Sequence, residues 1–245
     1  MMMKLRTLTL SILTLAAVSS IAATPAALPK PMTTAQYVAL GAPEPDHRWT
    51  VADYIAASRV ITALPPGKLP RKGSAMFTRI LSLDNLMPLH DARPLEQRGN
   101  IAFALLPPVK ALTQVYMRQS SVDAGLDAEA IDAMEFTITY FTEIGSLLDA
   151  RANTLPPNSP PPPLRGVMGG VASTALERLA DVKSYRLTER LRLANSLATS
   201  LPALLAHSNN DSRIAIRSQL TAITNASTEE EMKKAVAKIA ANLSS

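Results

Sequence analysis

The sequence lacks cysteine and is poor in aromatic residues, and both shortages limit what the protein can be. Without cysteine there is no disulfide framework, no thiolate ligand for zinc and no attachment site for a lipoprotein lipid. Phe, Trp and Tyr make up only 4% of the chain, whereas hydrophobic residues as a whole make up 47%. The core must therefore consist mainly of Leu, Ile, Val, Met and Ala, which is typical of helical bundles.

Histidine and glycine are scarce as well. The three histidines, His47, His90 and His207, are far apart in the sequence, and no HExxH motif is present. The sequence therefore predicts neither a metal site nor a cofactor. Glycine is rare outside two clusters, which suits helices better than sheets with many turns. We find no convincing strand pattern and no internal repeat.

The chain begins with a pattern typical of a secretory signal peptide. Lys4 and Arg6 form a short basic region, residues 7–23 are uncharged and mostly apolar, and small residues precede Ala22 and Ala23. A membrane anchor is the alternative, but it needs about 20 predominantly apolar residues, and this run is diluted by Thr and Ser. We expect cleavage near Ala22 or Ala23 and no transmembrane span in the mature chain.

Export and charge together narrow the class of partner. A cysteine-free exported chain fits the bacterial periplasm better than the eukaryotic secretory pathway, where exported domains often depend on disulfides. The formal net charge is +5, and Lys4 and Arg6 of the leader contribute two of these charges. The mature chain is thus only mildly basic, whereas a nucleic-acid-binding protein would show a denser basic stripe. We therefore expect a periplasmic or secreted protein that does not bind nucleic acid.

Helical periodicity predicts an all-α fold, a multi-helix bundle of about eight helices. The clearest segment carries Ile131, Met134, Ile138 and Phe141 on one face, with acidic residues on other faces. Pro107 and Pro108 should divide their segment into two helices, because proline lacks an N–H and clashes with the preceding turn. The expected helices are 33–40, 50–64, 74–87, 94–107, 108–120, 127–155, 171–207 with a kink or restart at Pro202, 209–223 and 227–243.

A proline-rich run followed by glycines, NTLPPNSPPPPLRGVMGG, separates the two halves of the chain. Its prolines favour an extended polyproline II spacer. A docking strand for an aromatic groove is the alternative, as is a phosphate loop at the glycines, which lacks the Lys-Ser/Thr pair of a P-loop. Whether the halves pack as one domain or two is left open. The expected organisation is a signal peptide (1–23), a mobile proline-bearing lead (24–49), a helical subdomain (50–155), the spacer (156–170) and a second helical subdomain (171–245).

Two basic groups are candidate binding residues. One lies in a proline-rich loop, and the other is expected on one face of the long helix at three-four spacing. Either group could contact an envelope protein or the anionic groups of lipids or glycans. The two groups are Lys68, Arg71 and Lys72, and Lys183, Arg186 and Arg190.

The functional expectation is an exported binding protein of the bacterial cell envelope, such as an adaptor, a chaperone-like factor or an inhibitor. It rests on amphipathic helices in a chain without a catalytic motif. The alternative is an envelope hydrolase or lyase whose site is assembled from several helices, with His90 and Asp91 as catalytic candidates. No GxSxG elbow supports that alternative.

Overall fold

The structure is a computed structural model that describes residues 30–65, 67–120, 124–154 and 165–243. Within these ranges the chain forms nine α-helices, two short 3₁₀ helices and no strand, which confirms the all-α fold. The elements are α1 (Thr34–Ala39), α2 (Val51–Thr62), α3 (Ala75–Ile80), η1 (Leu83–Leu89), α4 (Leu95–Ser120), η2 (Ala124–Leu126), α5 (Asp127–Ala152), α6 (Arg165–Ala180), α7 (Leu187–Ala206), α8 (Asn210–Ala226) and α9 (Glu230–Asn242).

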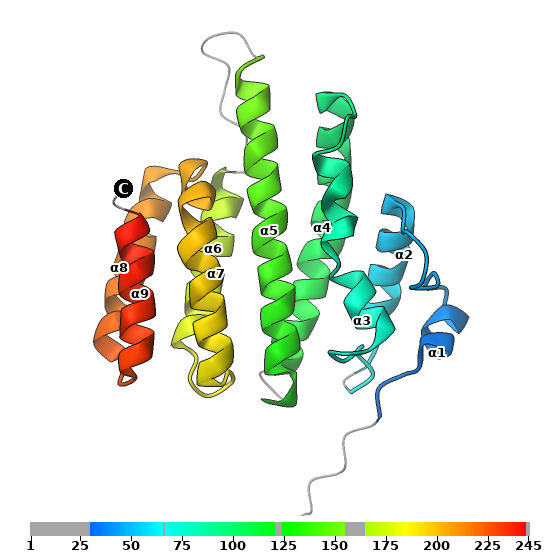
Figure 1. Cartoon of the computed structure of the whole chain (residues 1–245), viewed down its shortest axis with the longest axis horizontal. Coiled ribbons are helices and arrows are strands. Elements are labelled where there is room, and N and C mark those ends of the chain that lie inside the picture. The colour runs from blue at the N-terminus through cyan, green and yellow to red at the C-terminus, as the bar shows by residue number, and fades with distance from the viewer. Residues whose placement is uncertain (1–29, 66, 121–123, 155–164, 244–245) are drawn as a thin grey trace, which may run out of the picture.

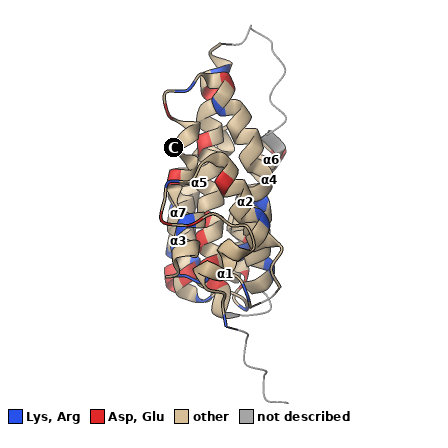
Figure 2. Cartoon of the chain, turned by 90° about the vertical axis from the view of Figure 1, so that its right-hand side faces the viewer, with Lys and Arg blue, Asp and Glu red and all other residues tan. Residues whose placement is uncertain are grey.

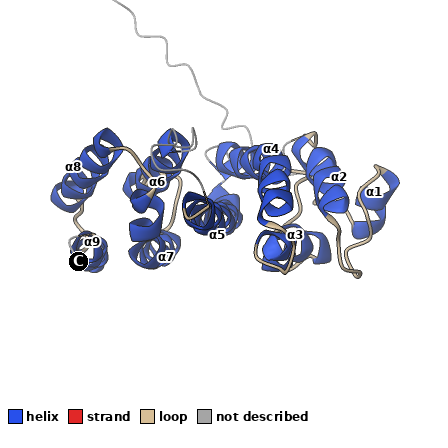
Figure 3. Cartoon of the chain, turned by 90° about the horizontal axis from the view of Figure 1, so that it is seen from above, coloured by secondary structure: helices blue, strands red, loops and turns tan. Residues whose placement is uncertain are grey.

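The helices form two layers that run along the long axis of the molecule (Figure 3). The first layer holds α2, α4, α6 and α8, and the second holds α3, α5, α7 and α9. Helices pack within a layer, as α7 does on α9, and between layers, as α4 does on α5. From α4 onward successive helices alternate in direction (Figure 1), so the molecule is a row of stacked helical hairpins.

A single cluster of buried apolar side chains runs through the stack, from Tyr37 in α1 to Ile239 in α9. The helix α5 contributes ten residues to this cluster, and 14 of its 26 residues are buried when polar residues are included. An amphipathic helix on the surface buries only one stripe, so α5 must be covered on more than one side. It packs against α4, α6, α7 and η1.

Part of the lead that we expected to be mobile belongs to this core. The expected helix near residues 33–40 is present as α1, and Thr33 and Gln36 form its capping box. Tyr37 is buried and its hydroxyl donates a hydrogen bond to the carbonyl oxygen of Lys68 at 2.8 Å. Trp49 is also buried, so residues 37–49 of the lead are held against the core at both ends, by Tyr37 and by Trp49.

The expectation that Pro107 and Pro108 divide their segment was wrong, because α4 continues through both prolines. The prolines leave the carbonyl groups of Phe103 and Ala104 without their helical N–H donors. Both of these residues are exposed, so water can satisfy the two carbonyl groups. Buried residues precede and follow the prolines, and their burial stabilises one continuous helix: Ala102, Leu105, Val109, Leu112, Val115 and Tyr116.

The prediction of a single long helix over 171–207 was also wrong, because the structure divides this segment between α6 and α7. Asp181 ends the first helix, since its carboxylate accepts hydrogen bonds from the backbone N–H groups of Lys183 and Ser184. Asp and Asn commonly close turns in this way. Tyr185 then turns into the core. Pro202, by contrast, lies within α7 and does not end it.

The proline-rich spacer can be compared with the structure only in part. Residues 156–164 of the expected spacer lie outside the described residues. Residues 165–170, which include the glycines, form the first turns of α6 rather than an irregular loop. The two halves that the spacer joins in sequence meet directly, since α5 packs on α7.

The helices were also compared with the requirements of a membrane span. In the part of the chain that the structure describes, no helix is both long enough and apolar enough to cross a bilayer.

Gly169 and Gly170 test the packing of α6 on α8. A Cβ atom at Gly169 would lie 2.6 Å from Cβ of Ser212, whereas one at Gly170 would meet nothing within 4 Å. We expect Gly169→Ala to destabilise the fold by about 1–3 kcal/mol through overpacking. Gly170→Ala should stabilise it by up to about 1 kcal/mol, because alanine favours helix. Urea unfolding measures both, and a Gly169→Ala protein as stable as Gly170→Ala would contradict the packing.

Candidate functional site

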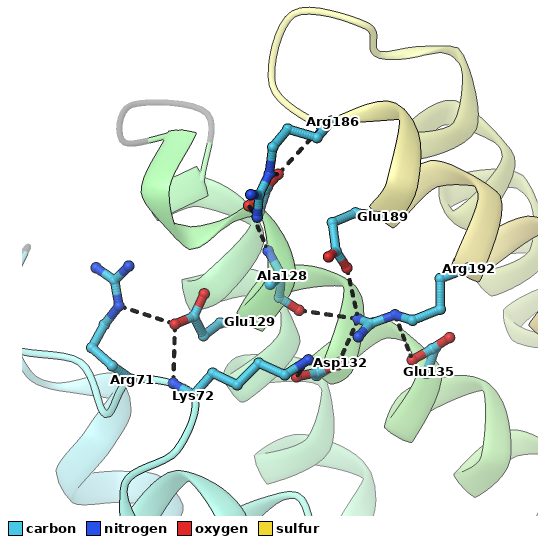
Figure 4. A network of polar contacts seen from close by, with 10 residues as sticks. Arg71, Lys72, Ala128, Glu129, Asp132, Glu135, Arg186, Glu189 and Arg192 are labelled. Carbon is cyan, nitrogen blue, oxygen red and sulfur yellow. Dashed lines mark hydrogen bonds and ion pairs between the residues drawn. The ribbon is translucent and has the colours of Figure 1, made fainter.

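Three of the six basic residues that the sequence singled out, Arg71, Lys72 and Arg186, lie in contact with α5. Nε of Arg71 lies 3.0 Å from a carboxylate oxygen of Glu129, and the backbone N–H of Lys72 donates to the same oxygen at 3.0 Å. Glu129 is only 4% exposed, so these contacts satisfy a charge that would be costly to bury alone. The loop before α3 is therefore tied to the first turn of α5 (Figure 4).

Arg186 makes a similar contact from the other half of the chain. Its guanidinium donates two hydrogen bonds to Asp127, from Nε at 2.6 Å and from Nη2 at 2.8 Å, and its backbone N–H adds a third at 3.2 Å. Burial alone would raise the pKa of Asp127. The hydrogen bonds and charge of Arg186 outweigh that effect and hold the pKa below its usual value.

Arg192 completes the network between α5 and α7. It forms ion pairs with Asp132 and, at 3.2 Å, with Glu189, and it donates to the carbonyl oxygen of Ala128. Burial raises the pKa of the nearby Glu135, although the charge of Arg192 opposes that rise. The N-terminal half of α5 is thus the shared acidic partner of basic residues from both halves of the chain (Figure 4).

The remaining candidates differ in their surroundings. Arg190 is only 2% exposed, donates to the carbonyl oxygen of Leu179 at 2.6 Å and pairs with Glu229 at 3.2 Å. Nζ of Lys68 donates to the carbonyl oxygen of Lys30, and Lys183 is exposed in the connection between α6 and α7.

The expectation that Lys183, Arg186 and Arg190 share one helix face was wrong, because the chain turns at Asp181 before α7 begins. In the view of Figure 2, Lys and Arg positions are interspersed with Asp and Glu positions along the helices. A ligand for the six basic residues stays a prediction.

The catalytic candidates His90 and Asp91 contact different partners. Nδ1 of His90 lies 3.4 Å from a carboxylate oxygen of Glu143, and its Nε2 lies 3.1 Å from the sulfur of Met87. Asp91 instead pairs with Arg93. A hydrolase triad requires the acid to orient the histidine, and here Glu143 of α5 occupies that position rather than Asp91.

A groove of about 620 Å³ lies where the first layer is interrupted. Within that layer α2 packs on α4 and α6 packs on α8, but among the described residues α4 and α6 have hardly any direct contact. The walls of the groove come from α4 and α6, and α5 forms its floor. The lining residues are Lys110, Thr113, Gln114, Met117 and Arg118 of α4, Met134, Thr137 and Phe141 of α5, and Val167, Gly170, Val171, Thr174 and Arg178 of α6.

The groove combines an apolar interior with charge of one sign. Its lining holds three cationic side chains, those of Lys110, Arg118 and Arg178, and no carboxylate. On each wall the lining residues recur every three to four positions, so each helix presents one face. At 1.5 Å per residue, these faces make the groove about 12–16 Å long.

One end of the groove is closed where α4 and α6 terminate. The hydroxyl oxygens of Ser120 and Tyr185 lie 2.8 Å apart and form a buried hydrogen bond between α4 and the α6–α7 connection. Burial raises the pKa of Tyr185, with smaller opposing effects from Ser120 and from the charge of Arg178.

Sequence reasoning did not find this groove or its three cations. Lys110 and Arg118 lie in the expected helix 108–120, but α4 and α6 are separated by a whole helix in the sequence. A pocket with convergent polar groups is the usual place for a ligand.

Other kinds of site have less support in the structure. Within the described ranges no group of three or more His, Asp or Glu side chains could hold a metal ion. Comparison of the chain with protein-family models, curated proteins and solved structures gave no match. A function is therefore inferred from the groove and from the sequence pattern of residues 1–23.

The ion pair of Asp127 and Arg186 makes the stability of the fold depend on pH. The folded pKa of Asp127 is depressed, so its contribution is present above the unfolded pKa of about 3.9. That contribution is lost as the pH falls through the folded value. We expect Asp127→Asn to lower the free energy of unfolding at pH 7, and the difference from the original protein to shrink below about pH 4.

Urea unfolding between pH 3 and pH 7 measures this dependence. Glu231→Gln, at an exposed position of α9, is the matched control and should change stability little at any pH. A deficit of Asp127→Asn that is constant across this range would show that the carboxylate does not stabilise the fold through its charge.

Proposed function

We propose that this chain is an exported binding protein of the bacterial cell envelope and that the groove between α4 and α6 is its binding site. The observation that carries the proposal is the combination of an apolar interior with three cations and no carboxylate in the lining. Such a lining attracts a partly apolar ligand of negative charge. An adaptor, a chaperone-like factor or an inhibitor would each need a site of this kind.

The position of the groove supports binding rather than a purely structural role. Elsewhere in the first layer, neighbouring helices cover each other's apolar faces. At the groove, Met117, Val167 and Val171 are only partly buried, although Met134 and Phe141 below them are buried. A ligand would remove this remaining apolar surface from water, and that burial is favourable.

Photocrosslinking in living cells tests the binding role. A photoreactive residue placed at Gln114, on the exposed edge of the α4 wall, should form adducts with whatever occupies the groove. The same residue at Ser218, exposed on α8 away from the groove, is the control. Adducts of any size at Gln114 and none at Ser218 are expected, whereas equal labelling at both positions or no labelling would count against a binding site here.

Export makes a separate prediction. When the full chain is expressed in a Gram-negative host, it should be recovered from the periplasm or the medium with its N-terminus at Ala23 or Thr24. Fractionation followed by N-terminal sequencing measures this. Recovery of a chain that still begins at Met1 from the cytosol would overturn the proposed location and leave the groove unaffected.

A further inference from the structure

The groove is closed at its floor by buried side chains. Its floor residues Met134 and Phe141 are 2% and 0% exposed, so even water hardly reaches them from above. The partly buried side chains of Met117 and Val171 stand over this floor from the two walls. Over a length of about 12–16 Å, a volume of about 620 Å³ corresponds to a cross-section of about 40–50 Å². This is less than the cross-section of a helix with its side chains, which is about 10–12 Å across. An unbranched chain could lie along the groove.

The polar groups of the groove are arranged unevenly along its length. Arg118 and Arg178 lie near the C-terminal ends of α4 and α6, beside the hydrogen bond of Ser120 and Tyr185 that closes this end. The apolar residues Phe141 and Val167 lie further along the groove. Two of the three cations therefore lie at one end, and the third, Lys110, lies about two turns away on the α4 wall. Between these charges the lining is apolar with interspersed threonines.

Arg178 carries an unsatisfied donor at this closed end. Its Nε atom is buried and has no hydrogen-bond partner among the described residues. The nearest carboxylate oxygens, on Glu177 and Asp181, are 3.8 Å from its terminal nitrogens, beyond hydrogen-bond distance. A buried donor without a partner costs free energy, and an anionic oxygen in the groove could remove that cost.

From this arrangement we propose that the groove binds a single-chain amphiphile with an anionic headgroup. The headgroup lies against Arg178 and Arg118, and the hydrocarbon chain lies over Phe141 between Met117 and Val171. A long-chain carboxylate and a lysophospholipid phosphate share this chemistry. The inference rests on the proposed function, since it specifies the ligand of the same site.

The test uses the mature protein and cis-parinarate, a fluorescent long-chain carboxylate whose emission rises in apolar surroundings. We expect saturable binding that myristate displaces. Tetradecanol has the same chain without the charge and should displace the probe at least tenfold less well. Myristoyl lysophosphatidate is compared with myristate to identify which anionic headgroup is preferred.

Variants at Val171 and Arg178, each with a control, test whether the ligand binds in the groove. Val171→Asp should weaken probe binding at least tenfold, whereas Ala215→Asp, the same change at an exposed position of α8, should not alter it. Arg178→Gln should reduce the preference for myristate over tetradecanol, and Arg178→Lys should retain part of it. Circular dichroism and thermal unfolding of each variant confirm that it is folded.

Two results would overturn the inference. One is the absence of saturable binding to the original protein, and the other is unchanged binding in a folded Val171→Asp variant. If the inference fails while Gln114 forms adducts of protein size in cells, the proposed binding function stands with a different ligand. If Gln114 forms no adduct either, both the ligand and the binding function are wrong.

Discussion

The burial of α5 is the constraint on which the rest of the structure depends. Its apolar residues are covered by α4 and η1 on one side and by α6 and α7 on the other. Its first turns supply Asp127 and Glu129, which pair with basic residues from both halves of the chain. Burying such carboxylates is tolerable only because each has charged hydrogen-bond donors. Both apolar packing and ion pairs therefore hold α5 in place. The N-terminal and C-terminal halves of the chain each contribute residues to these contacts.

The groove follows from this central position. Because α5 reaches toward the first layer between α4 and α6, those two helices rest on it rather than on each other. Their faces remain partly uncovered, and the uncovered surface carries Lys110, Arg118 and Arg178 without neighbouring acids in the lining. The acidic residues in the N-terminal half of α5 pair instead with the basic residues of the network in Figure 4. The basic residues that pair with the first turns of α5 are thus different from those that line the groove.

Short-range sequence patterns were sufficient to predict the all-α fold and the residues at which several helices begin. The capping boxes that begin α1 and α2 involve residues three apart, so they are visible in the sequence. The continuity of α4 through Pro107 and Pro108 depends instead on the burial of its residues against other helices. The end of α6 depends on a turn in which the carboxylate of Asp181 accepts a backbone hydrogen bond. The candidate site was even harder to predict from the sequence. Arg186 meets Asp127 across 59 residues, and periodicity carries no information about such pairs or about a groove between helices that are not consecutive.

Native mass spectrometry of the mature protein, purified gently from a bacterial envelope, tests the central claim most directly. The claim is that the groove between α4 and α6 holds an anionic amphiphile. It predicts a cleaved chain that carries one small acidic adduct, and the loss of that adduct in a folded Val171→Asp protein. A chain recovered bare, or an adduct that persists unchanged in that variant, would contradict it.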